Sequence, residues 1–307
     1  MRGIGLVGAV SKFEEYGYRF RNVAGSSAGA IIASLIAAGY TADELHEELT
    51  KVEFGKFKQS AFWHGLGPIG AAIGAAKNFG MYSATYFEKW LEELLAKKGV
   101  STFADIKRSL KLTASDITDG KMIVLPDDLQ KFGIEPADFK VATAVRMSMS
   151  IPLFFEPYKL VDKEGLLHYI VDGGMLSNYP IWLLDDGKKL DVPVFGIRFA
   201  RSTGQEKSRK DNIFTYIKQL VSTAIDVREN EYQIFARGDK QRTVTISTRI
   251  GKKPVSMTDF EMSRELIDGM YNNGVYAADI FLREWDFRQW KRDYRSNPSG
   301  IMRRFFK

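Results

Sequence analysis

A run of small residues near the start of the chain limits the possible folds more than any other feature. It reads Val23-Ala24-Gly25-Ser26-Ser27-Ala28-Gly29-Ala30 and contains the pattern G-x-S-x-G with Ser27 at its centre. A strand that turns sharply into a helix holds the central serine in a strained conformation, so residues without side chains, here Gly25 and Gly29, are needed on both sides. The turn also directs the first free N–H groups of the helix toward the serine hydroxyl, where negative charge can be held.

The flanking residues predict a strand before this turn and a helix after it. Residues 18–24 alternate in polarity and end apolar, as a strand would. Residues 30–38 are apolar on every face and end at Gly39, which predicts a fully buried helix closed by a glycine cap. A tight strand–helix connection without any chemistry is the alternative interpretation of the same pattern.

Strands and helices alternate along the rest of the 307-residue chain. The alternation predicts a single domain over residues 1–307, with a three-layer α/β/α fold around a mainly parallel central sheet. The predicted strands include a hairpin turning at Asp119-Gly120 and an apolar strand, 166–171, that runs directly into Asp172-Gly173-Gly174. The predicted helices cover residues 40–52, 83–98, 212–236 and 259–295, the last with a break at Asn272-Asn273-Gly274, and residues 139–149 fit a strand or a short helix.

The apolar residues of segment 54–82 follow neither the period of a strand nor that of a helix. The segment combines several aromatic residues with a run of glycine and alanine over residues 65–76, and it carries little charge. Two interpretations stand side by side. The segment is either a buried connector or a mobile apolar cover over a pocket for acyl chains.

A serine hydroxyl becomes a useful nucleophile only when a base takes its proton. The chain has three histidines, His46, His64 and His168. In hydrolases with the G-x-S-x-G pattern the chain order is Ser, then acid, then His. No histidine follows His168, and the best acid candidate, Asp172, comes after it, so this triad order fails. We interpret His46 as a surface histidine and His168 as a structural one.

Asp172 is therefore the candidate base. Ser27 and Asp172 each follow an apolar strand and each precede a glycine-rich turn. Catalytic sites in open parallel sheets form beyond the carboxyl ends of strands, so the two side chains would meet if their strands were parallel neighbours. An aspartate near its reference pKa of ~3.9 is a weak base, and we expect Asp172 to be partly desolvated. A plain turn at Asp172-Gly173 is the alternative.

Four ordered motifs resemble those of the patatin-like phospholipases, and the resemblance covers most of the chain. They are Arg2-Gly3-Ile4-Gly5-Leu6-Val7-Gly8, Gly25-Ser26-Ser27-Ala28-Gly29, Ser148-Met149-Ser150-Ile151-Pro152 and Asp172-Gly173-Gly174. The resemblance implies that family's α/β fold and a Ser–Asp dyad, without histidine, that hydrolyses acyl esters of lipids. It makes Ser27 the nucleophile and Asp172 its partner, and Asn178 and Pro180 fit the turn that follows.

The first motif departs from the family pattern. That pattern is three glycines, any residue, a basic residue and a glycine, and its main-chain N–H groups supply the oxyanion hole. Arg2 and Gly3 match its end and Met1 takes the variable position, but the strand and the glycine triplet do not occur in the sequence. A GTG valine codon taken as the initiator would explain this start. We expect a partial oxyanion hole at Arg2, Gly3 and Ala28, and losing one donor can cost on the order of a hundredfold in rate.

The sequence thus predicts a lipid acyl hydrolase that forms an acyl-enzyme and needs no metal or other cofactor. Its substrate would be a phospholipid or another acyl-ester lipid. A non-catalytic lipid-binding or regulatory protein that retains the fold is the alternative, and the missing glycines favour it. A nucleic-acid binder is rejected, because no recognised nucleic-acid module is present.

Charge and composition bear on location and on lipid contact. The net charge of +6 fits an anionic partner such as a phospholipid surface. Residues 283–307 interleave aromatic with basic side chains, which either lie at such a surface or, as we favour, pack their aromatic rings on the domain. The sequence has no cysteine, no signal peptide and no apolar run of ~18 residues. We expect a cytoplasmic protein with peripheral membrane contact.

Overall fold

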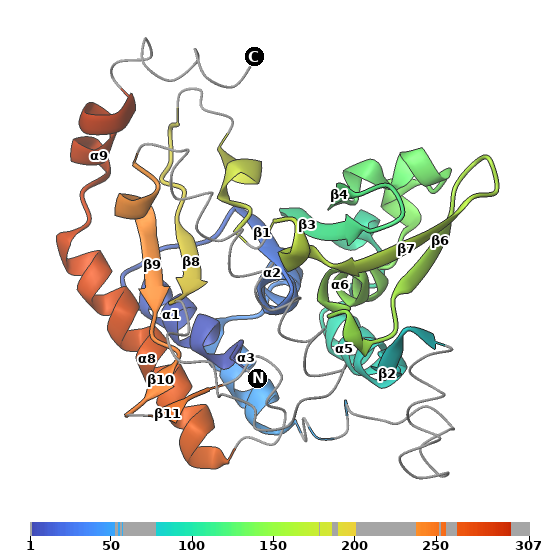
Figure 1. Cartoon of the computed structure of the whole chain (residues 1–307). Coiled ribbons are helices and arrows are strands. Elements are labelled where there is room, and N and C mark those ends of the chain that lie inside the picture. Colours follow the sequence, from blue (N-terminus) through green and yellow to red (C-terminus); the bar gives the residue numbers. More distant parts are fainter. Residues whose placement is uncertain are drawn as a thin grey trace.

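Helices and strands alternate along the chain in the computed structural model (Figure 1). The structure describes residues 2–52, 55, 57, 78–177, 179–185, 190–200, 238–251, 253–255 and 263–295. The helices are α1 (Ile4–Glu15), α2 (Ala28–Ala38), α3 (Ala42–Thr50), α5 (Thr85–Lys97), α6 (Val141–Met149), α8 (Arg264–Glu284) and α9 (Phe287–Arg295). The strands are β1 (Asn22–Ser26), β2 (Gly80–Tyr82), β3 (Ser109–Asp116), β4 (Lys121–Leu125), β5 (Leu153–Phe155), β6 (Tyr158–Val161), β7 (Leu167–Asp172), β8 (Gly196–Phe199), β9 (Thr243–Ile246), β10 (Arg249–Ile250) and β11 (Lys253–Pro254).

The largest sheet is built around β3. Strand β1 pairs with β3 in parallel, whereas β4 and β7 pair with it antiparallel, and β6 pairs antiparallel with β7. The α/β class is confirmed, but the described sheet is mixed where we expected it to be mainly parallel. The reason is local, because Gly120 and Gly165, both with positive φ, lie in the tight turns of two hairpins, β3–β4 and β6–β7. Short turns of this kind can join only antiparallel strands.

The register shows that β1 and β7 share one edge of β3. Strand β4 pairs with residues 112–116 of β3, β1 with residues 109–113 and β7 with residues 114–116. A strand has two edges, so β4 occupies one of them, and β1 and β7 lie end to end along the other. The two strands run in opposite directions, and their carboxyl ends meet beside Thr113 and Ala114.

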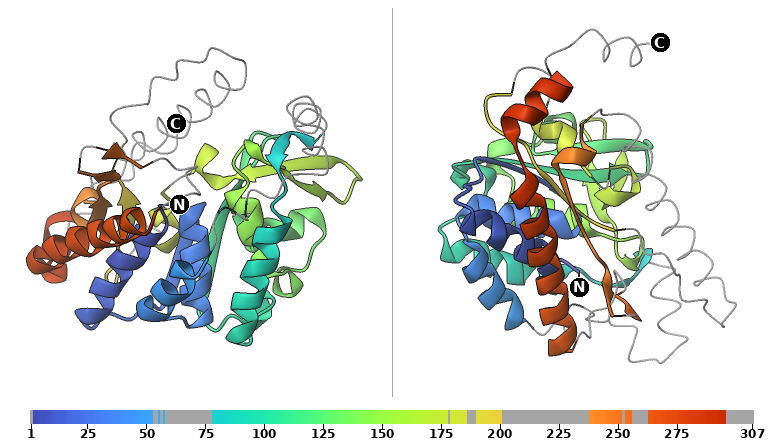
Figure 2. Two further views of the ribbon diagram at one scale, coloured as in Figure 1. Left: turned by 90° about the horizontal axis from the view of Figure 1, so that it is seen from below. Right: turned by 90° about the vertical axis from the view of Figure 1, so that its left-hand side faces the viewer.

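The helices that follow β1 form as the sequence predicts. All residues of α2 from Ala30 to Ala37 are buried, and Gly39 follows the helix with φ 101°. Helix α3 begins with a capping box in which the side chains of Thr41 and Glu44 accept from each other's main-chain N–H. Figure 2 shows the helices of this first part of the chain gathered on one side of the strands. The strand predicted at 18–24 is shorter and begins later, as β1, and the segment predicted as a strand or short helix at 139–149 forms a helix, α6, over 141–149.

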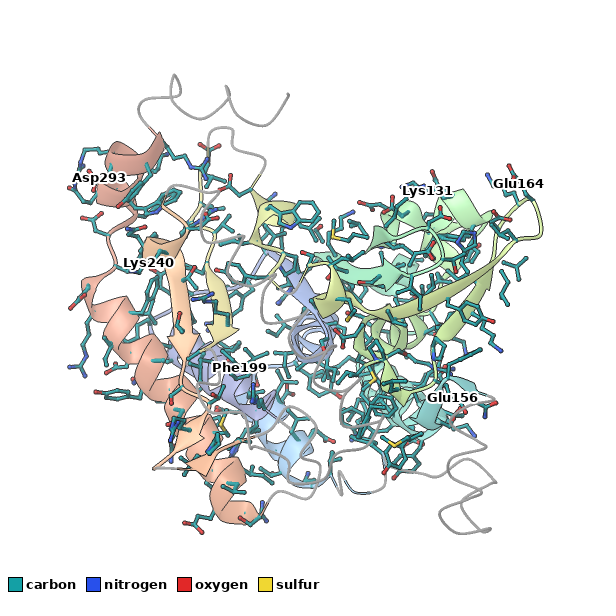
Figure 3. The ribbon with its side chains drawn as sticks, in the orientation of Figure 1. Lys131, Glu156, Glu164, Phe199, Lys240 and Asp293 are labelled. Carbon is teal, nitrogen blue, oxygen red and sulfur yellow. The ribbon has the colours of Figure 1, made fainter. Side chains whose placement is uncertain are left out.

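Helix α8 runs unbroken past Asn272-Asn273-Gly274, so the predicted break at these residues is wrong. Here glycine permits close helix packing. A Cβ atom at Gly274 would lie 1.9 Å from the carbonyl oxygen of Gly5 in α1, and one at Gly8 would lie 2.1 Å from that of Tyr271 in α8. Figure 1 shows α8 along one flank, beside α1 and β9. Phe199, labelled in Figure 3, approaches Gly5 from β8.

The central aromatic residue of α9, Trp290, faces the protein. Trp290 is buried and donates from Nε1 to the carbonyl of Gly238 at 2.9 Å. The guanidinium groups of Arg242 and Arg295 each lie 5.1 Å from the ring centroid of Trp290. For residues 285–295, the favoured alternative, packing on the domain, therefore holds. None of the helices in the described ranges combines the length and apolar composition needed to cross a bilayer.

Several predictions concern residues outside the described ranges. These are the Gly/Ala run and His64 within residues 54–82, the helix at 212–236, Asn178, and the end of the chain from residue 296. Phe57, which is described, is fully buried and contacts the ring of Phe87 edge to face in α5.

Candidate active site

Ser27 lies between the end of β1 and the first residue of α2. Its φ of 53° and ψ of −122° are strained for a residue with a side chain. A Cβ atom at Gly25 would lie 2.3 Å from the carbonyl oxygen of Gly29, so only glycine fits there. A Cβ at Gly29 would meet nothing within 4 Å, so packing does not require the second glycine that we expected to be obligatory.

Asp172 is the last residue of β7 and is only 2% exposed. Its Oδ1 accepts from the main-chain N–H of Gly174 at 2.7 Å. A Cβ at Gly173 would lie 2.2 Å from the carbonyl oxygen of Thr113, so glycine is needed where the chain turns against β3. The glycines of the D-G-G motif thus have separate tasks. Gly173 allows a close approach, and Gly174 supplies a donor.

The hydroxyl of Ser27 donates to Oδ2 of Asp172 at 2.5 Å. Burial raises the pKa of Asp172 from its ordinary value of 3.8 to about 6, although the hydrogen bonds from Ser27 and Gly174 lower it. No salt bridge to Asp172 is present among the described residues. The carboxylate is therefore a stronger base than an exposed aspartate, because burial disfavours its charged form and no described cation pairs with it to offset this.

Helix α2 begins at Ala28, directly beside the serine hydroxyl. The N–H groups of Ala28 and Gly29 have no acceptor inside the helix and can hold negative charge, whereas the N–H of Ala30 donates to the carbonyl of Ser27 at 2.9 Å. Gly3 lies against this turn, since a Cβ at Gly3 would be 3.7 Å from that of Ala28. The side chain of Arg2 turns away, and its guanidinium donates to the carbonyl oxygen of Val255, with Nε at 2.7 Å. The three predicted oxyanion residues are thus near one another.

Ser148 contacts Ser27, and Ser150 contacts Asp172. The sequence placed both serines in a family motif but predicted no role for them in the site. The main-chain N–H of Ser27 donates to Oγ of Ser148 at 3.0 Å. The main-chain N–H of Asp172 donates to the carbonyl of Ser150 at 2.9 Å. The only sequence signal was two serines, two positions apart, at the end of an apolar segment before Pro152.

The two described histidines lie elsewhere. His168 is buried four residues before Asp172 on β7, roughly 13 Å along an extended strand. Its Nδ1 is 2.7 Å from Oδ2 of Asp116 and its Nε2 is 3.4 Å from Oδ2 of Asp162. Burial lowers the pKa of His168, but the hydrogen bonds with these two carboxylates outweigh burial and raise it. His46 packs against the ring of Tyr271 in α8.

One group of side chains in the described part of the chain has the spacing of metal ligands. The ligand atoms of Asp116, Asp119 and His168 lie within 4.8 Å of one another. Asp116 also accepts from the main-chain N–H groups of Thr118 and Asp119 in the β3–β4 turn. Hydrogen bonds therefore already engage this group, and it is separate from Ser27 and Asp172.

A polarised hydroxyl, a buried carboxylate and free N–H groups at a helix start can together support nucleophilic attack on an ester carbonyl. In comparison with known proteins, residues 1–185 match the family described as patatin-like phospholipase. The chain is 38% identical over 289 residues to the protein YqhO of Bacillus subtilis (strain 168), which is 94% of this chain and 96% of YqhO.

More distant relatives are also similar. Over 190 residues, 59% of either chain, it is 25% identical to the probable lipid hydrolase 463L of Invertebrate iridescent virus 6. Over 168 residues, 53% of this chain and 46% of the relative, it is 29% identical to the cUMP-AMP-activated phospholipase of Escherichia coli. The solved structure of VipD from Legionella pneumophila matches in fold with a TM-score of 0.51 and 15% identity, over 92% of this chain and 65% of VipD.

Proposed function

Because the chain belongs to the patatin-like phospholipases, we propose that it is a lipid acyl hydrolase that cleaves carboxylic ester bonds of phospholipids or related acyl lipids. One observation carries the proposal. The Ser27 hydroxyl, on a strained strand–helix turn, donates to a buried Asp172 whose pKa is about 6. Such a carboxylate is ionised at neutral pH and can still accept a proton.

In the proposed mechanism, Asp172 takes the Ser27 proton as the hydroxyl oxygen attacks the ester carbonyl. The main-chain N–H groups near Gly3 and Ala28 hold the negative oxygen that develops. The intermediate collapses, the alcohol leaves with the proton that Asp172 holds, and an acyl-enzyme remains. Water then attacks the acyl group, Asp172 accepts its proton, and the fatty acid is released as Ser27 regains its hydrogen.

Substrate of this class is held in membranes, so the proposal includes peripheral contact with a lipid surface. Trp290 of α9 is a poor candidate for that contact, because it is buried in the protein.

The test is hydrolysis of a short acyl ester and of phospholipid vesicles by the wild type and by Ser27→Ala. We expect the substitution to abolish both reactions, and a fluorophosphonate to label Ser27 in the wild type. Ser34→Ala is a matched control, because Ser34 is a buried serine of α2 whose hydroxyl donates to the carbonyl of Ile31. Hydrolysis retained by Ser27→Ala would refute the assignment. An unlabelled Ser27 in folded protein would favour the non-catalytic alternative.

A further inference from the structure

The backbone of Ser27 is held by a side chain from another part of the fold. Its N–H precedes the helix and points to Oγ of Ser148, 121 positions later, at 3.0 Å. Ser148 is fully buried near the end of α6. Backbone at positive φ is costly for a residue with a side chain, so such a conformation persists only where the surroundings fix it. This hydrogen bond is one such restraint.

The backbone of Asp172 is held by the same short segment. Its N–H donates to the carbonyl of Ser150 at 2.9 Å, and the hydroxyl of Ser150 donates back to the carbonyl of Arg146 at 2.8 Å. One segment of three residues, 148–150, therefore contacts the main chain on both sides of the bond between Ser27 and Asp172.

Helix α6, which carries this segment, is itself anchored. Arg146 forms an ion pair with Glu88 of α5 at 2.9 Å, and the hydroxyl of Thr143 donates to the same carboxylate at 2.6 Å. The guanidinium of Arg146 also lies over the ring of Tyr158 in β6. The segment 148–150 thus projects from a helix that is fixed to two neighbouring elements.

We propose that residues 148–150 position the dyad, with the Ser148 hydroxyl fixing the backbone of Ser27 and the Ser150 carbonyl fixing that of Asp172. This inference rests on the proposed function only in treating Ser27 as the nucleophile. Ser148 touches neither the substrate nor the reacting atoms, and it acts through Ser27. Replacing it with alanine leaves the partly buried N–H of Ser27 without this acceptor, and the turn relaxes to satisfy it. A displacement of about 1 Å at a reacting group can cost on the order of a hundredfold in rate.

The test measures the rate at which a small fluorophosphonate labels Ser27, because this reaction needs no lipid recognition. We expect labelling of Ser148→Ala to be about 10- to 100-fold slower than that of the wild type. Ser150→Ala should slow labelling less than Ser148→Ala does, because it keeps the carbonyl that holds Asp172. Ser34→Ala, the same change at a buried serine away from the dyad, should label within about twofold of the wild type.

The pH profile separates positioning from general destabilisation. The hydrogen bond from Ser27 lowers the pKa of Asp172. If Ser148→Ala displaces Ser27, that bond weakens, and the pH at which labelling is half-maximal should move upward. A purely structural role would lower the melting temperature and leave this midpoint unchanged. Ser148→Thr, which keeps a hydroxyl acceptor, should restore most of the rate.

The outcomes are distinct. Wild-type labelling and an unshifted midpoint in folded Ser148→Ala would overturn the inference. If that variant does not fold, Ser148→Cys takes its place, since it keeps the volume but offers only a weak acceptor. Slow labelling of folded Ser148→Cys supports the inference and a wild-type rate overturns it. Failure of the proposed function gives a different result. A wild type that is labelled at Ser27 but cleaves no lipid would refute the lipid hydrolase, and the labelling rates of the wild type and the Ser148 variants could still be compared.

Discussion

Asp172 and Asp185 are both buried aspartates, and their surroundings are opposite. Asp172 accepts hydrogen bonds only from neutral donors, the Ser27 hydroxyl and the Gly174 N–H, among the described residues. Oδ2 of Asp185 pairs with two guanidinium groups, that of Arg242 at 2.6 Å and that of Arg295. One carboxylate keeps its basicity because no cation neutralises it, and the other is locked into an ion network.

This difference separates the candidate active site around Asp172 from a structural ion network around Asp185. The ion network joins the segment after β7 to α9, and the guanidinium groups of both arginines lie near the ring of Trp290. Asp239 adds a second acid to Arg242 at 2.5 Å. Burial raises the pKa of Asp239, although Arg242 opposes this shift. The proposed chemistry and the anchoring of α9 therefore fall to different aspartates.

The largest expected effect is the loss of activity in Asp172→Asn. The amide cannot accept the Ser27 proton, and we expect hydrolysis and labelling to fall on the order of 10³-fold. The variant should melt at pH 7 no lower than the wild type, because it removes a buried carboxylate that has no cation beside it. Activity near the wild-type level would contradict the role of Asp172 as the base.

The next effect is on stability, in Asp185→Asn. The substitution leaves two partly or fully buried arginines with less compensating charge, and we expect it to cost about 3 kcal/mol in the free energy of unfolding. Urea denaturation measures this cost, and the labelling rate of the protein that remains folded should be unchanged. Asp127→Asn is the control, since Asp127 is an exposed partner of Lys111 and should cost under about 1 kcal/mol. Equal stability of the two variants would contradict the structural role.

The smallest effect is the pH dependence that the raised pKa of Asp172 implies. Activity requires the ionised carboxylate, so the rate should be level above about pH 7, half of that at about pH 6 and about tenfold lower at pH 5. The folded pKa exceeds the ordinary 3.8, so the native state binds the proton more tightly than the unfolded chain does. Ionised Asp172 therefore destabilises the fold fully above pH 6, and this cost disappears as the pH falls through 6 toward 3.8.

Comparison of the wild type with Asp172→Asn isolates the contribution of ionised Asp172 to stability. The wild type should gain stability relative to the variant as the pH falls, and thermal melts of both proteins across that window measure the gain. A constant difference would mean that Asp172 has an ordinary pKa in the fold.

The sequence was sufficient for the local structure around the dyad. The glycine cap at Gly39, the capping box at Thr41 and the hairpin at Gly120 depend on nearby residues, and all three form as predicted. The closeness of Ser27 and Asp172 was also predicted, but for the wrong reason. Their strands are not parallel neighbours, because the choice of edge on β3 depends on long-range pairing that no local pattern contains.

Contacts between distant residues were beyond local reasoning. Nothing in Gly274 itself distinguishes a helix break from a close contact with Gly5, since both uses need a missing side chain. The same holds for Ser148, whose partner is 121 positions away. Asp185 and Arg295 are 110 positions apart, and the pair Asp185-Asp186 after an apolar run gives no sign of the two arginines that Asp185 contacts.

Because β1 and β7 lie end to end along β3, strand β3 sets the distance between the two residues of the dyad. Ser26 is in register with Thr113, and Asp172 with Ala114, so one peptide unit of a third strand spaces the two halves of the dyad. Side chains of β3 can be substituted without altering that spacing, because main-chain hydrogen bonds set it. An insertion or deletion at this step would change it at once, since a shift of one residue carries a strand end about 3.3 Å and reverses its faces.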